Sequence, residues 1–242
     1  MVFLAVVCAG IAACAAEPAS PTDEKKYPDP KRFEKDIAAF EAQDKEQPPP
    51  RGAIVCIGSS SMKGCHRWIQ QDLAPLTVIP RGFGGSDMYD AAYYADRIVI
   101  PYSPRAILLY EGDNDIAAGI SPEKVRDTFR EFVKNVRKKL PRVRIYVLSI
   151  KPSPSRWTLW PKMQEANRLL KRECARGRRL TYIDVASPML DSTGQPVADI
   201  FLADNLHMNR KGYEAWRDVV RPVLMKAEQK YEKPAGKAGE VR

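Results

Sequence analysis

Five short apolar runs alternate with segments of helical periodicity along most of this chain, and this alternation constrains the fold more than any other feature. Parallel strands need long crossover connections, and strands buried on both faces read as near-continuous apolar runs. The pattern therefore predicts an α/β fold with a central parallel five-stranded sheet covered by helices on both faces. The expected strands are Ala53–Ile57, Thr77–Ile79, Ala106–Tyr110, Val143–Ile150 and Leu180–Val185, and the expected helices are 61–72, 87–97, 122–140, 160–176 and 210–227.

The segments at either end of this repeat differ in composition. Residues 17–50 begin with a stretch rich in Pro, Ala and charge, which is typical of a tether. Apolar residues then recur at helical spacing, so we expect an amphipathic helix over 31–45 that lies on a body formed by residues 51–227. The charged tail 228–242 contains Pro and Gly and is expected to be flexible.

Residues 1–16 carry no charge and run from Phe3-Leu4-Ala5-Val6-Val7 into small residues. This segment is too short for a membrane span and resembles the apolar core and cleavage region of an export signal. Ile11-Ala12-Ala13-Cys14 also resembles the processing box of bacterial lipoproteins, in which the Cys is lipidated, and ordinary signal cleavage near Ala15 is the alternative. We expect an exported protein that is periplasmic, secreted or anchored to a membrane through Cys14.

The net charge of +9 raises the question of nucleic-acid binding. The basic residues are spread along the chain and interleaved with acids, as Arg126 and Arg130 are with Asp127 and Glu131. This pattern is typical of a solvated helix face, and no nucleic-acid-binding motif accompanies it. With 242 residues and a mean hydropathy of -0.40, the chain reads as a globular protein with one sizeable core and no nucleic-acid partner.

Three of the expected strands run into segments that can carry chemistry. The first leads to Gly58-Ser59-Ser60-Ser61 and a helix, which presents a serine hydroxyl in front of free helix N–H groups. The second leads to Gly82-Phe83-Gly84-Gly85, where backbone can approach a ligand, and the third leads to Gly112-Asp113-Asn114-Asp115, whose Asn amide can donate to an oxyanion. Each segment alone also fits a helix cap or a turn. Together they meet at the carboxyl edge of one sheet, where α/β folds bind ligands.

One of the two histidines, His207, comes three residues after Asp204 and just before the last expected helix. A carboxylate beside an imidazole fixes its tautomer and stabilises its protonated form, as a general base requires. A loop at this position can fold back over the same edge of the sheet. The chain thus offers a nucleophile, a base with its orienting acid, and oxyanion donors, which is the set that acyl transfer needs.

These segments together resemble the SGNH or GDSL hydrolase family, and especially its branch similar to platelet-activating-factor acetylhydrolase. The resemblance covers residues 51–227 and implies a flavodoxin-like three-layer α/β/α sandwich with neither a metal nor an organic cofactor. Ser59 stands where the family usually has the Asp of Gly-Asp-Ser, and alignment to that block selects Ser60 as the nucleophile. The four matching blocks are, in order, Ile57-Gly58-Ser59-Ser60, Gly82-Phe83-Gly84-Gly85, Gly112-Asp113-Asn114-Asp115 and Asp204-Asn205-Leu206-His207.

The resemblance also implies a role for each matching residue. Ser60 is the expected nucleophile, with Asp204 and His207 completing a catalytic triad. The Ser60 N–H, the Gly85 N–H and the Asn114 side chain are the expected oxyanion hole. The implied activity is that of a serine esterase that forms an acyl-enzyme.

Other candidate sites are weaker. Cys65 and His66 are adjacent on an expected helix, where neighbouring side chains point about 100° apart, so they make a poor nucleophile and base. Two histidines without metal-ligand spacing argue against a metal site. The cysteines after the N-terminal segment, Cys56, Cys65 and Cys174, lack a Cys-x-x-Cys pair and allow at most one disulfide.

The choice of substrate depends on loops that the motifs do not define. Lys151, Arg156, Trp157 and Trp160 follow the fourth strand, where they either line the site as a specificity loop or cap the core. For an exported enzyme we expect hydrolysis of short acyl groups, such as acetyl, from carbohydrate, with a small ester or an acylated carbohydrate as the partner. An O-acyltransferase on the same site and a non-catalytic glycan-binding protein are the alternatives.

Overall fold

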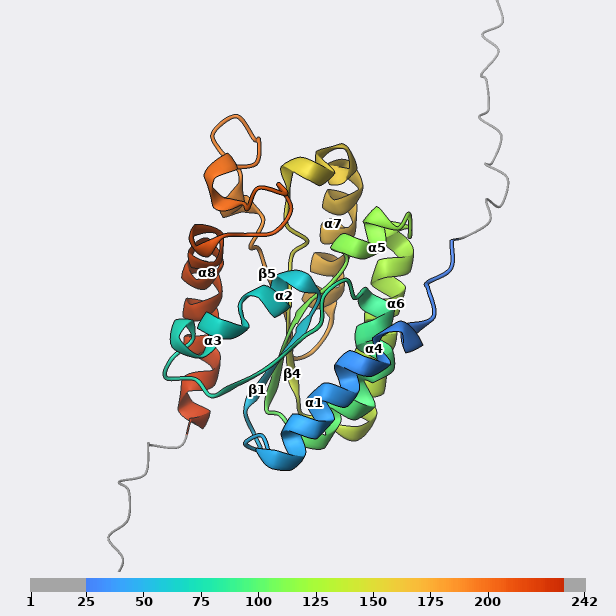
Figure 1. Ribbon diagram of the computed structural model, residues 1–242, viewed down its shortest axis with the longest axis vertical. Coiled ribbons are helices and arrows are strands. Elements are labelled where there is room, and N and C mark those ends of the chain that lie inside the picture. The colour runs from blue at the N-terminus through green and yellow to red at the C-terminus, as the bar shows by residue number, and fades with distance from the viewer. Residues whose placement is uncertain (1–24, 233–242) are drawn as a thin grey trace, which may run out of the picture.

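A five-stranded sheet in which all neighbouring strands run parallel forms the centre of the structure (Figure 1). The computed structural model describes residues 25–232. The strand order β2-β1-β3-β4-β5 is that of flavodoxin-like doubly wound folds, so the predicted fold class is confirmed. The strands are β1 (Ile54–Gly58), β2 (Val78–Gly82), β3 (Ala106–Tyr110), β4 (Arg144–Leu148) and β5 (Leu180–Ile183).

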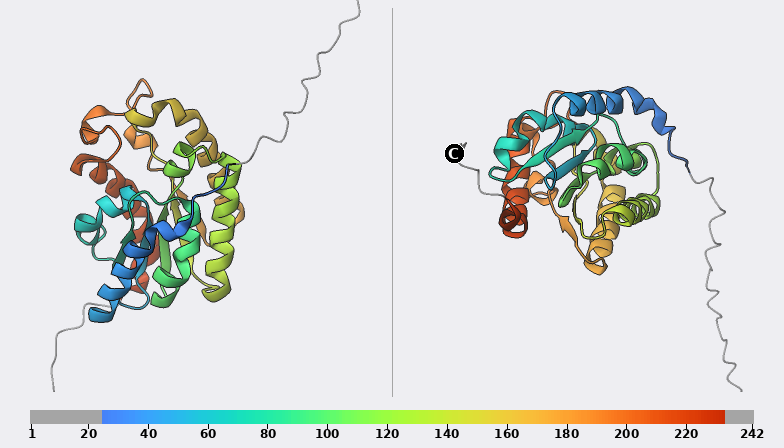
Figure 2. Two further views of the ribbon diagram at one scale, coloured as in Figure 1. Left: turned by 45° about the vertical axis from the view of Figure 1, so that its right-hand side comes forward. Right: turned by 90° about the horizontal axis from the view of Figure 1, so that it is seen from below.

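Helices cover both faces of this sheet and complete the three layers (Figures 1 and 2). Within the described residues they are α1 (Glu34–Glu46), α2 (Ser60–Gly64), α3 (His66–Asp72), α4 (Met88–Ile98), α5 (Asp113–Ala117), α6 (Pro122–Lys139), α7 (Trp160–Arg176) and α8 (Arg210–Glu228). One face carries α4, α6 and α7, with α1 packed on α4, and the other carries α2, α3 and α8. Because both faces are covered, the central strands β1 and β3 are apolar and buried along their whole length.

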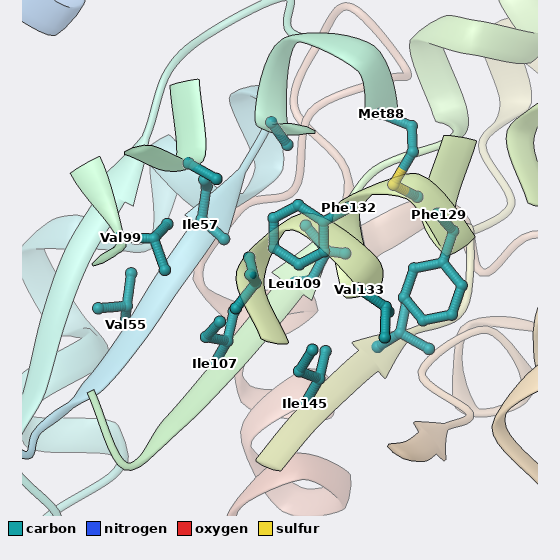
Figure 3. Packing of buried hydrophobic residues seen from close by; sticks show 14 of the residues in the cluster. Val55, Ile57, Met88, Val99, Ile107, Leu109, Phe129, Phe132, Val133 and Ile145 are labelled. Atoms are coloured by element: carbon teal, nitrogen blue, oxygen red, sulfur yellow. The ribbon is translucent and has the colours of Figure 1, made fainter. Parts of the chain in front are cut away.

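The longest helix on the first face, α6, follows from its residue spacing. Phe129, Phe132 and Val136 recur three and four positions apart, and all three are fully buried. Figure 3 shows how side chains of this helix cover the strand residues of the core. The Ser121 hydroxyl accepts the Lys124 N–H at 3.2 Å and caps the first turn. The helix predicted over 122–140 is therefore confirmed to within one residue.

The helix predicted over 61–72 is wrong in one respect, because the structure divides it into α2 and α3 at Cys65. In a continuous helix, the carbonyl of Ser61 would accept the Cys65 N–H. Here Tyr213 of α8 donates its hydroxyl to that carbonyl at 3.0 Å. A contact from the other end of the chain thus replaces the local hydrogen bond, which sequence periodicity does not reveal.

The prediction of a flexible tail over 228–242 is also wrong for residues 228–232. Glu228 ends α8 and is fully buried, where Tyr146 donates to it at 2.6 Å and Arg144 pairs with it. Glu232 then accepts from the N–H of Thr77 at 2.7 Å. A buried carboxylate needs such partners, so these ion pairs and hydrogen bonds hold the chain to the body through residue 232.

The predicted tether is likewise shorter than expected. Tyr27 packs against the core, and its hydroxyl donates to Asp115 at 2.9 Å. Its ring stacks on Tyr89 with the ring centres 5.4 Å apart. The chain is therefore bound to the body from about residue 25, whereas the amphipathic helix predicted over 31–45 is present as α1 and the short turn of 3-10 helix before it, Pro30–Phe33.

Several predictions concern residues outside the described part of the chain. These are the export signal over 1–16 with its Cys14, the tether over 17–24 and the tail over 233–242. Between residues 25 and 232, none of the helices has the length and apolar character that crossing a membrane requires.

Candidate active site

The carboxyl ends of β1, β2 and β3 bring the three predicted strand-end segments to one edge of the sheet. From β1 the chain moves outward to β2 and then returns to β3 on the other side of β1. α/β folds place their ligand sites at the carboxyl edge where the chain reverses in this way. Figure 1 shows that α5 and the loop before α8 lie at the same end of the molecule.

Ser60 is the first residue of α2, directly after the end of β1. Gly58 makes the turn possible, since its φ is +155° and a Cβ there would lie 2.2 Å from the carbonyl oxygen of Tyr110. The next residue, Ser59, donates its N–H to that same oxygen at 3.2 Å. The strand therefore ends against β3, and the Ser60 side chain emerges at the sheet edge, partly exposed.

His66, the second histidine, has a structural position. Its Nε2 accepts the N–H of Gly82 at 2.9 Å and so ties α3 to the end of β2. Burial, followed by the charges of Arg81 and Lys63, lowers the pKa of His66 to about 4. The ring is therefore neutral near pH 7. It holds in place the segment Gly82–Gly85, which we call the glycine-rich loop.

That loop lies beside Ser60. A Cβ on Gly84 would be 3.9 Å from the Cβ of Ser60, which shows how closely the two segments approach. Gly85 has a φ of +89°, a conformation that favours glycine. Within the described residues, no hydrogen bond occupies the backbone N–H of Gly85 or of Ser60.

Asn114 joins the loop after β3 to the loop after β2. Its Nδ2 donates to the carbonyl of Ser86 at 2.8 Å. Since a side-chain amide nitrogen carries two hydrogens, one remains for another acceptor. The loop beside Ser60 therefore carries Gly85 and also holds the side chain of Asn114.

Asp204 and His207 occupy the loop before α8. The Asp204 Oδ1 accepts the N–H groups of Leu206 and His207, both at 2.9 Å, while its Oδ2 lies 2.6 Å from Nδ1 of His207. The hydrogen bond from His207, with those two N–H groups, lowers the pKa of Asp204 to about 2. Although 49 % of its side chain is exposed, Asp204 is thus a carboxylate at any ordinary pH.

The imidazole of His207 connects this loop to Ser60. Its Nε2 lies 3.0 Å from the Ser60 hydroxyl oxygen, and its Nδ1 faces Asp204. Ser60 and His207 are 147 positions apart in the chain. Together with Asp204 they form one continuous line of hydrogen-bonding groups. A hydroxyl, an imidazole and a carboxylate in this order can move a proton away from the hydroxyl as its oxygen attacks an electrophile.

The four residues singled out after β4 were expected either to line the site or to cap the core, and they differ in this respect. Trp160 is buried in the core, and Trp157 packs against it with ring centres 6.0 Å apart, so the tryptophans cap the core. Lys151 and Arg156 instead pair with Asp113, beside Asn114.

Three buried cysteines, Cys56, Cys65 and Cys174, are free thiols.

Glu111 was not singled out from the sequence, yet it lies directly below the glycine-rich loop. It is fully buried, and its Oε1 accepts the Ser86 hydroxyl at 2.6 Å, while its Oε2 has no hydrogen-bond partner among residues 25–232. Burial, and then the charge of Asp115, raise the pKa of Glu111 well above its usual range. Burial thus favours the protonated form of this carboxyl in the folded protein.

This proton makes stability depend on pH. In the unfolded chain a Glu loses its proton near pH 4.5, so above that pH the folded state binds more protons and stability falls, by up to about 1.4 kcal/mol per pH unit for one group. We expect Glu111→Gln to match the wild type in melting temperature at about pH 4.5 and to exceed it at about pH 8. Glu123→Gln, on an exposed site, is the matched control. Equal melting temperatures of Glu111→Gln and wild type at both pH values would contradict the assignment.

A comparison with known families places the sequence. The profile of the GDSL-like lipase/acylhydrolase family matches residues 52–215, more than half of the chain. The chain belongs to this family. As a member it is an ester-hydrolysing enzyme, and the resemblance seen in the four sequence blocks is confirmed.

Solved structures share the fold of this family member at low sequence identity. A Streptococcus pneumoniae protein provisionally described as a platelet activating factor has a TM-score of 0.70 at 20% identity, covering 80% of this chain and 93% of its own. A GDSL-like lipase of Bacteroides thetaiotaomicron has a TM-score of 0.63 at 18% identity, covering 82% and 98%. A variant of an acetyl-xylooligosaccharide esterase from Geobacillus has a TM-score of 0.57 at 13% identity, covering 74% and 94%. Among curated proteins, no sequence matches this chain.

Proposed function

We propose that this enzyme is a serine esterase in which Ser60 is the nucleophile. The observation that carries the proposal is the line of contacts from the Ser60 hydroxyl to His207, at 3.0 Å, and on to Asp204, at 2.6 Å. As the Ser60 oxygen bonds to the ester carbonyl carbon, its proton passes to Nε2 of His207, and Asp204 stabilises the imidazolium. His207 then gives this proton to the departing alcohol, which leaves an acyl-enzyme. Water hydrolyses the acyl-enzyme by the same route and restores the Ser60 hydroxyl.

The negative charge that develops on the carbonyl oxygen needs donors in place before the reaction. The N–H groups of Ser60 and Gly85 are free for this purpose, and Asn114 keeps one amide hydrogen available. Such preorganised donors stabilise the transition state more than the substrate, because the full charge appears only there. We therefore assign the oxyanion hole to these three groups.

Replacement of Asn114 by alanine is expected to lower kcat by about a hundred- to a thousand-fold, since one oxyanion donor is lost. KM for a small ester should change little, because the donor acts on charge that the ground state lacks. Steady-state hydrolysis of p-nitrophenyl acetate measures both constants. Asn135→Ala, on the exposed face of α6, is the control. A KM effect with unchanged kcat would show that Asn114 binds substrate and not the oxyanion.

For the substrate, we infer a short acyl group, such as acetyl, on a carbohydrate. The side chains of His207 and Asp204 are 37% and 49% exposed, which leaves the reacting groups open to an extended chain. The fold shared with an acetyl-xylooligosaccharide esterase agrees with this assignment. We further infer that the protein is exported, on the uncharged apolar character of residues 1–16, with Cys14 as a candidate lipid anchor.

A panel of esters tests the substrate assignment. Short- and long-chain p-nitrophenyl esters and an acetylated polysaccharide are compared, with released acid measured beside the Ser60→Ala variant. We expect acetate release from the polysaccharide and faster cleavage of acetyl than of long-chain esters. Preference for long chains would overturn the substrate class while leaving the esterase intact. Transfer of acetyl to an added sugar in excess of hydrolysis would identify an acyltransferase.

A further inference from the structure

Asp113, which precedes Asn114 in α5, forms a cluster with Lys151 and Arg156. Asp113 accepts from Nζ of Lys151 at 3.2 Å and from Nη1 of Arg156 at 2.7 Å. The side chains of Lys151 and Asp113 are only 1% and 6% exposed. Burial alone would raise the pKa of Asp113, but the charges and hydrogen bonds of the two cations together lower it below its usual value. Asp113 is therefore held as a carboxylate between a lysine and an arginine.

Arg156 also reaches the side chain of Asn114. The same Nη1 of Arg156 that binds Asp113 also donates to Oδ1 of Asn114 at 3.0 Å. On its other side, Nδ2 of Asn114 donates to the carbonyl of Ser86 at 2.8 Å. A guanidinium can only donate and a carbonyl can only accept, so the two partners allow one orientation of the amide.

The orientation matters because an asparagine amide can turn over with little change in shape. The turned form would point Oδ1 toward the site and repel a developing oxyanion instead of binding it. Arg156 excludes that form, since its donor would then face the Nδ2 hydrogens. Its positive charge also draws electron density toward Oδ1 and makes the remaining amide N–H a stronger donor.

The cluster also reaches the loop that carries His207. Lys151 donates to the carbonyl of Leu206 at 2.9 Å, and the N–H of Ser155 donates to the carbonyl of Asn205 at 3.1 Å. The segment 151–156 thus holds both the loop of the base and the loop of the oxyanion donor.

We propose that Arg156 is a positioning residue for ester hydrolysis, which fixes the amide of Asn114 with its N–H toward the oxyanion while Asp113 and Lys151 hold the guanidinium in place. The proposal rests on the proposed function, because it assigns Asn114 as an oxyanion donor. Arg156 itself acts through Asn114 and touches no reacting atom. Its effect therefore requires Asn114 to be present.

A double-mutant cycle tests this dependence. Arg156→Met keeps the length of the side chain and removes its donors, while Asp113 keeps Lys151 as its counter-charge. With p-nitrophenyl acetate we expect kcat to fall about ten-fold and KM to stay within about two-fold. In the Asn114→Ala background, the same substitution should change kcat by less than about two-fold, since the group it orients is gone. Arg168→Met, which removes an exposed ion pair with Glu165, is the control.

Each other outcome of the cycle overturns the proposal. The same loss of kcat in both backgrounds would mean that Arg156 acts on the fold or on another group. A rise in KM alone would mean that it contacts substrate. Should Arg156→Met fail to fold, Arg156→Lys replaces it in the cycle. This variant must then lower kcat when Asn114 is present and leave kcat unchanged in the Asn114→Ala background. If wild type and Ser60→Ala hydrolyse esters equally, the proposed function itself fails, whereas an active wild type with an additive cycle refutes only the role of Arg156.

Discussion

Replacement of Ser60 by alanine is expected to lower turnover of a carboxylic ester about a million-fold. The hydroxyl lies 3.0 Å from Nε2 of His207, and no other group among the described residues stands in this relation to the imidazole. Without the hydroxyl, neither the acyl-enzyme nor the proton transfer that forms it is possible. Release of p-nitrophenol by wild type and variant at equal concentration measures the loss, down to the background rate of hydrolysis.

Two measurements make this prediction specific for Ser60. A fluorophosphonate should label the wild type at the peptide that contains Ser60 and leave Ser60→Ala unlabelled, as peptide mass spectrometry will show. Ser61→Ala is the matched control, because this neighbour is buried, and it should stay within about ten-fold of wild type. Near-normal esterase activity of Ser60→Ala, or labelling at Ser59 or Ser61, would refute the assignment of the nucleophile.

Replacement of Asp204 by asparagine is expected to lower kcat about ten thousand-fold. The variant keeps an oxygen for the N–H groups of Leu206 and His207, so the loop before α8 should retain its shape. It loses the negative charge that faces Nδ1 of His207 at 2.6 Å. The imidazolium that forms during attack is then unsupported, and an amide N–H in place of the carboxylate favours the wrong tautomer.

The measurement is steady-state hydrolysis of the same ester, together with the melting temperature of the variant. The melting temperature should change little, because Asp204 is half exposed and its contact with His207 is open to water. Asp199→Asn is the control, since this exposed acid, paired with Lys211, lies close before the same loop. A loss below about ten-fold in Asp204→Asn would remove Asp204 from the catalytic set.

Much of the fold could be predicted from local pattern. The strands are apolar because both faces of the sheet are covered, and the crossover helices carry their apolar residues on one face, as Phe129 and Val136 do in α6. Both signals depend on burial within one element and therefore appear in the sequence. The ends of elements were less predictable, since the division of α2 from α3 depends on Tyr213, more than 140 residues away.

The candidate site could be predicted to the extent that it consists of strand ends. Ser60, Gly85 and Asn114 each follow a strand, and parallel strands bring their carboxyl ends to one edge by topology alone. The residues that hold these groups were not predictable in the same way. In the sequence, Glu111 reads as a packing residue and Asp113 as part of a turn, because their partners, Ser86 and Arg156, lie on other segments.

The sequence by itself determined the class of fold, the order of the chemical groups along it and the family to which the chain belongs. Periodicity, strand-end position and short blocks are local, and each is written in consecutive residues. Only the tertiary structure decided which groups meet: the 3.0 Å contact of His207 with Ser60, the contacts of Tyr27 with Asp115 and of Glu228 with Tyr146, and the guanidinium of Arg156 on Asn114. These contacts join distant segments by hydrogen bonds between single side chains, which leave no periodic trace in the sequence because one residue on each side is enough.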